Sequence, residues 1–228
     1  MTEELPVAVL VVAKAPVPGL AKTRLAATVG DAGAADVAAA ALLDTLDAVA
    51  AAPVAARVVA MTGDLSAASQ AAQIRRRLAD FTVVPQRGDD FGDRLANAHA
   101  DASAAAGGLP VLQIGMDTPQ VSAALLAECA RALTSSDAVL GIAADGGWWV
   151  LGVTDPDTAE CLRAVPMSTT RTGELTLAAL RGTGIEVAPA TELADVDTVD
   201  DIEVVRRECS PDSRFRQVTL ALEVGRAG

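Results

Sequence analysis

Short apolar runs alternate along this chain with longer alanine-rich stretches that have helical spacing. The runs 5–13 (LPVAVLVVA), 57–62 (RVVAMT) and 111–116 (VLQIGM) are mainly apolar. Between them, Leu42, Leu43 and Leu46 are spaced i, i+1 and i+4, which places them on one side of a helix. Apolar strands that alternate with helices predict an α/β domain whose mostly parallel sheet is covered on both faces.

The pattern predicts the elements in chain order. Strands are expected at 5–13, 57–62, 81–85, 111–116, 138–143, 148–153 and 185–188. Helices are expected at 34–51, 65–78, 91–105 and 119–133, in a short segment after Pro156, at 174–180, after Asp200 and from Ser213 onward. Together they predict a three-layer sandwich with a mixed, mostly parallel sheet. We expect one domain over residues 1–228, with residues 209–228 as a C-terminal helical extension.

Charge and composition narrow the function. The chain has 18 basic and 30 acidic residues, a formal charge of 18 − 30 = −12. This balance argues against nucleic-acid and anionic-membrane binders, which need a broad basic face. Three scattered cysteines suit a reducing cytoplasm, and a single histidine, His99, argues against histidine triads and multi-histidine metal sites. The acidic start and the short apolar run after it indicate a buried strand rather than a signal peptide or membrane span.

The loop after the first strand holds the only two lysines of the chain, Lys14 and Lys22, together with Arg24. Gly19 permits close backbone approach, and residues 22–24 would open the next helix, whose N-terminus favours anions. The loop does not match a Walker A motif, because the required glycines fall at Pro16 and Ala21. Phosphate binding is therefore predicted here, with a solvated basic turn as the alternative.

Two acidic stretches are candidates for a metal site. Asp117 follows the apolar run 111–116, where a carboxylate suits either a cation or a cap of the next helix, although Thr118 is better placed for capping. Asp195 and Asp197 are spaced i, i+2, so both project to one side of an extended segment. Asp197 would offer a second hard oxygen ligand for Mg²⁺ or Mn²⁺. A helix start is the alternative for that second stretch.

The segment 141–153 (GIAADGGWWVLGV) combines a carboxylate, two glycines and two tryptophans. Gly146 and Gly147 allow the backbone to pass close to another group, with Asp145 beside them. Trp148 and Trp149 are adjacent, so in a strand they face opposite ways. One can pack in the core while the other lines a pocket, and core packing alone is the alternative for either.

Two further loops contain polar side chains that suit contact with a phosphate or an acceptor. The first, after the strand at 81–85, contains Gln86, Arg87, Asp89 and Arg94 around two glycines. The second contains Ser168, Thr169, Thr170 and Arg171. Surface loops often have this composition without a function, so that alternative stays open.

Taken in order, these motifs resemble a known family. The set is KAPVPGLAKTRLA, QRGDDFGDRLANA, IGMDTP, ADGGWWVLGV, VPMSTTR and DVDTVDDI, over about residues 5–207. It is similar to a bacterial group of proposed glycosyltransferases in the nucleotide-diphospho-sugar transferase superfamily, which has the glycosyltransferase-A fold. More distantly, it is similar to the 2-phospholactate and molybdenum-cofactor guanylyltransferases.

The resemblance implies a role for each matching position. Asp117, Asp145 and Lys22 would be catalytic, and Asp117 and Asp197 would hold Mg²⁺ or Mn²⁺. Lys14, Lys22 and Arg24 would bind the nucleotide phosphates, and Gly146 and Gly147 would shape the acceptor side. From the loops themselves, we expect Pro16, Gly19, Gln86 and Arg94 to join the nucleotide and phosphate site, and Trp148, Ser168 and Thr169 to join the acceptor site.

The sequence departs from the family pattern at four positions. Ala144 stands where the family has Glu, Phe91 where it has Leu, Trp148 where it has Tyr, and Met167 where Trp is common. The first departure removes a carboxylate beside the expected acceptor site.

Three functions fit the sequence. The first is a cytoplasmic, metal-dependent glycosyltransferase that uses a nucleotide-sugar and a small-molecule acceptor. The second is a nucleotidylyltransferase in which a phosphorylated acceptor attacks the α-phosphorus of a triphosphate. The third is a nucleotide-binding protein without catalysis, which the absence of the carboxylate at position 144 would allow.

Overall fold

The computed structural model describes residues 4–194, 196 and 199–226 of the chain. Its strands are β1 (Leu5–Lys14), β2 (Val54–Thr62), β3 (Thr82–Pro85), β4 (Val111–Gly115), β5 (Ala138–Ile142), β6 (Trp148–Val153) and β7 (Val187–Pro189). Its helices are α1 (Thr23–Ala51), α2 (Ala71–Leu78), α3 (Phe91–Ala105), α4 (Ala123–Leu133), the 3₁₀ helix η1 (Pro156–Ala164), α5 (Thr172–Gly182), α6 (Val199–Glu208) and α7 (Arg214–Arg226).

The strands form one seven-stranded sheet in the order β3-β2-β1-β4-β6-β5-β7. Strands β1 to β4 run parallel to one another, while β6 pairs antiparallel with both β4 and β5. The sheet is therefore mixed and mostly parallel, as the sequence predicts. The parallel strands end at one edge, and in such sheets ligands bind beyond that edge.

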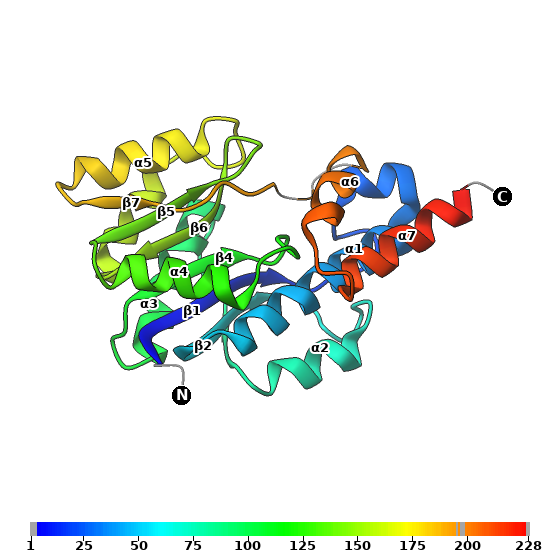
Figure 1. The fold of residues 1–228 in the computed structure, drawn as a ribbon, viewed down its shortest axis with the longest axis horizontal. Coiled ribbons are helices and arrows are strands. Elements are labelled where there is room, and N and C mark those ends of the chain that lie inside the picture. The colour runs from blue at the N-terminus through cyan, green and yellow to red at the C-terminus, as the bar shows by residue number, and fades with distance from the viewer. Residues whose placement is uncertain (1–3, 195, 197–198, 227–228) are drawn as a thin grey trace.

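Alternating residues of β1 show how the two faces of the sheet are covered. Val7, Val9 and Val11 pack in a cluster with side chains of α1, α2 and α4. Ala8 and Leu10 pack on the opposite face, against α3. On that face η1 and α5 extend the layer beyond α3, over β5 and β6. The result is the three-layer arrangement visible in Figure 1.

Helices α6 and α7 pack against the first half of α1, away from α5 (Figure 1). Phe215 of α7 is fully buried in this contact. The long helix α1 bends at Gly30, whose φ of 76° is not helical.

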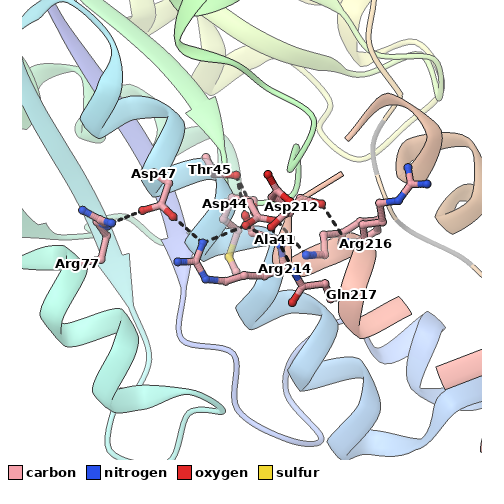
Figure 2. Close-up of polar contacts among 12 residues, drawn as sticks. Ala41, Asp44, Thr45, Asp47, Arg77, Asp212, Arg214, Arg216 and Gln217 are labelled. Atoms are coloured by element: carbon pink, nitrogen blue, oxygen red, sulfur yellow. Dashed lines mark hydrogen bonds and ion pairs between the residues drawn. The ribbon is translucent and has the colours of Figure 1, made fainter. Parts of the chain in front are cut away.

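The start of α7 is held by a carboxylate of α1 (Figure 2). Asp44 accepts hydrogen bonds from the backbone nitrogens of Arg214 at 3.1 Å and of Phe215 at 2.9 Å. Ser213 accepts a third bond, from the nitrogen of Arg216 at 3.1 Å. These bonds satisfy N–H groups that a helix start leaves without internal partners. Burial raises the pKa of Asp44, and this effect outweighs the bonds that lower it.

Three helix starts differ most from those the pattern predicts. Helix α2 starts at Ala71 rather than residue 65, because the preceding residues form turns. Helix α4 starts at Ala123 rather than at Pro119, and its cap is Ser122, which accepts a bond from the nitrogen of Leu125. The first helix starts at Thr23, where residues 22–24 were expected to open a helix, and not at residue 34, because α1 continues through its bend. In the part of the chain that is described, none of the helices has the length and apolarity needed to span a bilayer.

Candidate functional site

A cavity of about 450 Å³ opens at the edge where the parallel strands end. Lys14 of β1, Thr62 of β2 and Gly115 of β4 bring the strand ends to it. Its other walls come from the start of α3, the turn before β6 and the loop before α5. Its volume lies within the usual range of small-molecule sites.

Asp117 lies at this cavity and forms an ion pair with Lys22. The Nζ atom of Lys22 lies 2.8 Å from Oδ2 of Asp117, and it also donates a hydrogen bond to the backbone oxygen of Val196. The Lys22 side chain is 10% exposed and that of Asp117 is 37% exposed. Asp117 does not cap α4, since Ser122 does.

The backbone of Lys22 is in the left-handed region, with φ 47° and ψ 51°. This conformation is unfavourable for a residue with a Cβ atom, and such strain clusters at functional sites. It lies directly before α1 and turns the Lys22 side chain toward Asp117 and the segment before α6. Ser168, which lines the cavity, has a similar φ of 58°.

The residues around Asp117 fit a divalent cation in part. Its Oδ1 atom is buried and has no hydrogen-bond partner, so one hard oxygen lacks an interaction. Among the described residues, no group of three or more His, Cys, Asp and Glu side chains could hold a metal ion. Asp195 and Asp197 lie outside the described residues. One carboxylate with substrate phosphates and waters is a common way to hold Mg²⁺, so Asp117 suits that role.

The other predicted residues of the β1–α1 loop are in different environments. The exposed Lys14 lines the cavity, and its Nζ donates to the backbone oxygen of Leu20 at 2.9 Å. Pro16 is buried and its oxygen accepts a bond from Ser69, while Gly19 has φ 77° in the turn. Neither they nor the exposed Arg24 line the cavity. The structure thus places Lys14 on the cavity wall, links Lys22 to the cavity only through its ion pair with Asp117, and leaves Arg24 on the first turn of α1.

Gln86 and Arg94 both line the cavity, but their side chains have internal partners. The amide nitrogen of Gln86 donates to the oxygens of Ala13 at 2.8 Å and Ala60 at 2.9 Å. Gln86 therefore joins the ends of β1 and β2 and keeps no side-chain donor for a phosphate. Arg94 donates to the oxygen of Gly88 through Nε at 3.2 Å, which leaves its two terminal nitrogens as candidate donors.

The turn before β6 places Asp145 and Gly147 at the cavity, whereas Gly146 packs against the loop before α5. Oδ1 of Asp145 accepts a bond from the nitrogen of Gly147 at 2.7 Å, which orients this exposed carboxylate. Gly146 has φ 89°, and a Cβ atom there would lie 2.0 Å from the oxygen of Thr170. The two glycines predict that another group comes close to the backbone here, and at Gly146 that group is the backbone of Thr170.

The two tryptophans face opposite sides of the sheet. Trp149 is 2% exposed in the core, and its indole nitrogen donates to the oxygen of Thr191 at 2.7 Å. Trp148 is half-buried and lines the cavity. Each tryptophan therefore has one of the two roles that the sequence allows.

The loop before α5 places Ser168 and Thr169 at the cavity. It is held by Thr172, whose hydroxyl donates to the oxygen of Pro166 at 2.9 Å and accepts from the nitrogen of Thr169 at 3.0 Å. The first polar loop behaves differently, since Arg87 turns away to pair with Asp101 at 2.6 Å.

Sequence reasoning missed several residues that line the cavity. Gln113 and Gly115 of β4 are the most informative of these, and the signal for the first was a polar residue inside an apolar strand. Phe91 and Met167 also line it, next to Trp148, which the sequence did predict for a pocket. These three residues are among the four positions that depart from the family pattern.

Comparison with protein families gives one match. The family described as "Uncharacterized protein conserved in bacteria (DUF2064)" matches residues 45–169, which is more than half of the chain. No curated protein matches the chain.

Solved structures share the fold over nearly the whole chain. A proposed nucleotide-diphospho-sugar transferase from Desulfovibrio desulfuricans G20 is 26% identical, with a TM-score of 0.81 over 98% of this chain and 96% of that one. The 4-diphosphocytidyl-2C-methyl-D-erythritol synthase of Anaerococcus prevotii DSM 20548 is 14% identical, with a TM-score of 0.58 over 87% and 93%. Rv0371c of Mycobacterium tuberculosis H37Rv, solved in complex with manganese, is 18% identical, with a TM-score of 0.50 over 88% and 97%. The fold is that of the nucleotide-diphospho-sugar transferases and nucleotidyltransferases.

Proposed function

We propose that this chain, which belongs to the family DUF2064, is a metal-dependent glycosyltransferase that uses a nucleotide-sugar. The observation that carries the proposal is the ion pair that Lys22 forms with Asp117, which lines the cavity. An ammonium group at the start of α1 and a carboxylate just after β4 match what a diphosphate with its cation needs. The similarity to the Desulfovibrio protein supports the same class of substrate.

Lys14 and Lys22 would bind the diphosphate. Both ammonium groups now donate to backbone oxygens, of Leu20 and Val196, so each can exchange a neutral acceptor for a charged phosphate oxygen. Hydrogen bonds between charged groups are the stronger ones. Lys22 would at the same time leave Asp117, and the carboxylate would be available to a cation.

Asp117 would hold Mg²⁺ or Mn²⁺, and Asp197 is proposed as a second ligand. The bound ion would add positive charge beside the leaving diphosphate. Phosphates and waters would complete its coordination, as is usual for Mg²⁺.

Asp145 would act as general base. Its bond from Gly147 orients the carboxylate at the cavity, where an acceptor hydroxyl can approach. The hydroxyl oxygen forms the new bond to the anomeric carbon as the bond from that carbon to the diphosphate oxygen breaks. The hydroxyl proton passes to Asp145, and the lysines stabilise the charge that develops on the diphosphate.

A second candidate is nucleotidylyl transfer. It is favoured by the two cations that line the cavity, Lys14 and Arg94, beside the Lys22–Asp117 pair, since three cations suit a triphosphate. A phosphorylated acceptor would then attack the α-phosphorus and release pyrophosphate.

Thermal unfolding with a ligand panel tests the proposal. Because a ligand stabilises the state it binds, UDP-, GDP- and dTDP-sugars with Mn²⁺ should raise the unfolding temperature more than GTP, CTP or UTP. Product analysis then separates the reactions, since glycosyl transfer releases a nucleoside diphosphate and nucleotidylyl transfer releases pyrophosphate. A metal-dependent shift without either product indicates a binding protein without catalysis. No metal-dependent shift with any nucleotide contradicts the proposal.

A further inference from the structure

Gln113 is a buried polar residue that has no role in the fold described above. It lies in the central strand β4, is 1% exposed, and its Oε1 atom has no hydrogen-bond partner. A buried amide oxygen without a partner is unfavourable, and most native structures avoid it. Gln113 also lines the cavity, but its Oε1 atom is itself buried, so a ligand meets this atom only if the side chain changes its rotamer.

The surroundings of Gln113 are apolar. Its register partners are Leu10 of β1 and Leu151 of β6, and both are fully buried. Leu95 of α3, which is 2% exposed, lines the same cavity. A charged group beside Gln113 would have to be desolvated among these side chains, which is costly. A ligand group that meets the amide is therefore neutral and donates a hydrogen bond.

The strand connects Gln113 to the proposed diphosphate site. Gln113, Gly115 and Asp117 are at alternate positions, and all three line the cavity. Gln113 and Gly115 project to the same face of the sheet, about 7 Å apart along the strand at roughly 3.3 Å per residue. A group attached to a diphosphate at Asp117 therefore extends past Gly115 to reach Gln113.

Gly115 keeps this path open. A Cβ atom at Gly115 would meet nothing closer than the nitrogen of Asp117, at 4.0 Å. Its φ is not among the positive values, so alanine would be tolerated by the backbone. The space above Gly115 is thus part of the cavity, which a single methyl group would narrow.

Further out, the cavity walls suit an apolar ring face. Phe91, half of whose surface is exposed, lines the cavity together with Trp148 and Met167. A hexose offers both features, because its C–H groups form an apolar face and its hydroxyls donate hydrogen bonds.

We propose that Gln113 is a specificity-determining residue that accepts a hydrogen bond from a hydroxyl of the glycosyl group of a nucleotide-sugar, held over Gly115 by Phe91 and Trp148. This inference rests on the proposed function, because it assumes that the diphosphate binds at Lys22 and Asp117.

The test compares each diphosphate with its sugar conjugate by calorimetry in the presence of Mn²⁺. The pairs are UDP and UDP-glucose, GDP and GDP-mannose, and dTDP and dTDP-glucose. In the native protein, one sugar conjugate should bind at least fivefold more tightly than its diphosphate. In Gln113→Met, diphosphate affinity should stay within twofold while the gain from the sugar is lost.

Two other variants serve as controls. Gly115→Ala should also lose the gain from the sugar, and it provides the test if Gln113→Met does not fold. Thr176→Val removes another fully buried, unpartnered polar atom, which does not line the cavity. Both Gln113→Met and Thr176→Val should raise the unfolding temperature of the ligand-free protein, but Thr176→Val should keep the full gain from the sugar.

The experiment distinguishes failure of this inference from failure of the proposed function. If diphosphates bind but no sugar conjugate binds more tightly, or if Gln113→Met and Gly115→Ala both keep the gain, the role of Gln113 is wrong and the diphosphate site stands. If none of the three diphosphates binds with Mn²⁺, the proposed function and this inference are both wrong.

Discussion

Lys22 and Asp117 are 95 positions apart in the chain, yet Nζ of Lys22 lies 2.8 Å from Oδ2 of Asp117. The pair joins the start of α1 to the end of β4, at the edge where the parallel strands meet the cavity. Without a ligand, each charge partly neutralises the other. A diphosphate with its cation would give each of them a new partner, and this exchange is the central claim of the account.

The first prediction concerns Lys22. Lys22→Met keeps the length of the side chain and removes its charge. A charge-assisted hydrogen bond contributes roughly 1.5–3 kcal/mol, so the affinity for a Mn²⁺–nucleoside diphosphate should fall about 10- to 100-fold. Calorimetric titration measures it. Arg131→Met, at an exposed position in the last turn of α4, should leave affinity unchanged. A loss of stability without a loss of affinity would show that Lys22 is structural.

The second prediction concerns the metal. Asp117→Asn should abolish Mn²⁺ binding in the presence of nucleotide, because an amide oxygen is a much weaker ligand than a carboxylate. Electron paramagnetic resonance of Mn²⁺ reports the bound fraction directly. Asp80→Asn, at an exposed carboxylate beside Arg77, is the matched control and should bind Mn²⁺ as the native protein does. Unchanged Mn²⁺ affinity in Asp117→Asn would refute the assignment.

The third prediction uses the two tryptophans, the only ones in a chain without tyrosine. Trp148 lines the cavity and Trp149 is buried in the core. Ligand binding should therefore change the intrinsic fluorescence of the native protein and of Trp149→Phe, but not that of Trp148→Phe. If the change persists without Trp148, the ligand does not occupy this cavity.

The fourth prediction concerns pH. Burial lowers the pKa of His99 to about 3, whereas an unfolded histidine titrates near pH 6.5. Below pH 6.5 the unfolded state binds a proton that the folded state does not, so this group lowers stability as pH falls and stops doing so below about pH 3. Between pH 7 and 5 the loss should be about 2 kcal/mol.

Denaturant unfolding of the native protein and His99→Phe at both pH values measures this difference. Since other titrating groups contribute equally to both proteins, the variant should lose about 2 kcal/mol less than the native protein between pH 7 and 5. Equal losses would mean that His99 is accessible to protons in the folded state.

The fifth prediction concerns the contact between α1 and α7. Asp44→Ala leaves the nitrogens of Arg214 and Phe215 without their acceptor and removes one partner of the Arg214 guanidinium. The free energy of unfolding should fall by about 2–3 kcal/mol. Asp47→Ala removes a more exposed partner of Arg214 and Arg77, and should cost less than about 1 kcal/mol. Chemical denaturation measures both. Equal effects would show that the helix start does not depend on Asp44.

Much of the fold can be predicted from local pattern. The apolar runs gave the strands of the central sheet, because a strand covered on both faces must be apolar throughout. Alanine-rich segments were less informative at their ends. Residues 65–70 form turns and bends, and residues 119–122 form a turn and an extended segment, so the helices begin only after Gln70 and Ser122.

The site could be predicted in part. The carboxyl ends of parallel strands meet at one edge, so Lys14 and Asp117 were predictable as neighbours of one cavity. Lys22 was expected at the same site, but its direct ion pair with Asp117 was not predicted, because neither the spacing of 95 positions nor the left-handed backbone at Lys22 can be read from the local pattern. The hydrogen bonds of Gln86 could not be predicted either. Their acceptors are the backbone oxygens of Ala13 and Ala60, which no side-chain pattern in the sequence identifies. Asp197 lies outside the described residues, so its role as a ligand stays a prediction.

A crystal structure with Mn²⁺ and the nucleoside diphosphate that binds most tightly tests the central claim most directly. The account predicts anomalous density for Mn²⁺ in contact with the Asp117 carboxylate, and Nζ of Lys22 on a phosphate oxygen rather than on Asp117. A nucleotide bound away from this cavity, with the Lys22–Asp117 ion pair intact, would contradict it.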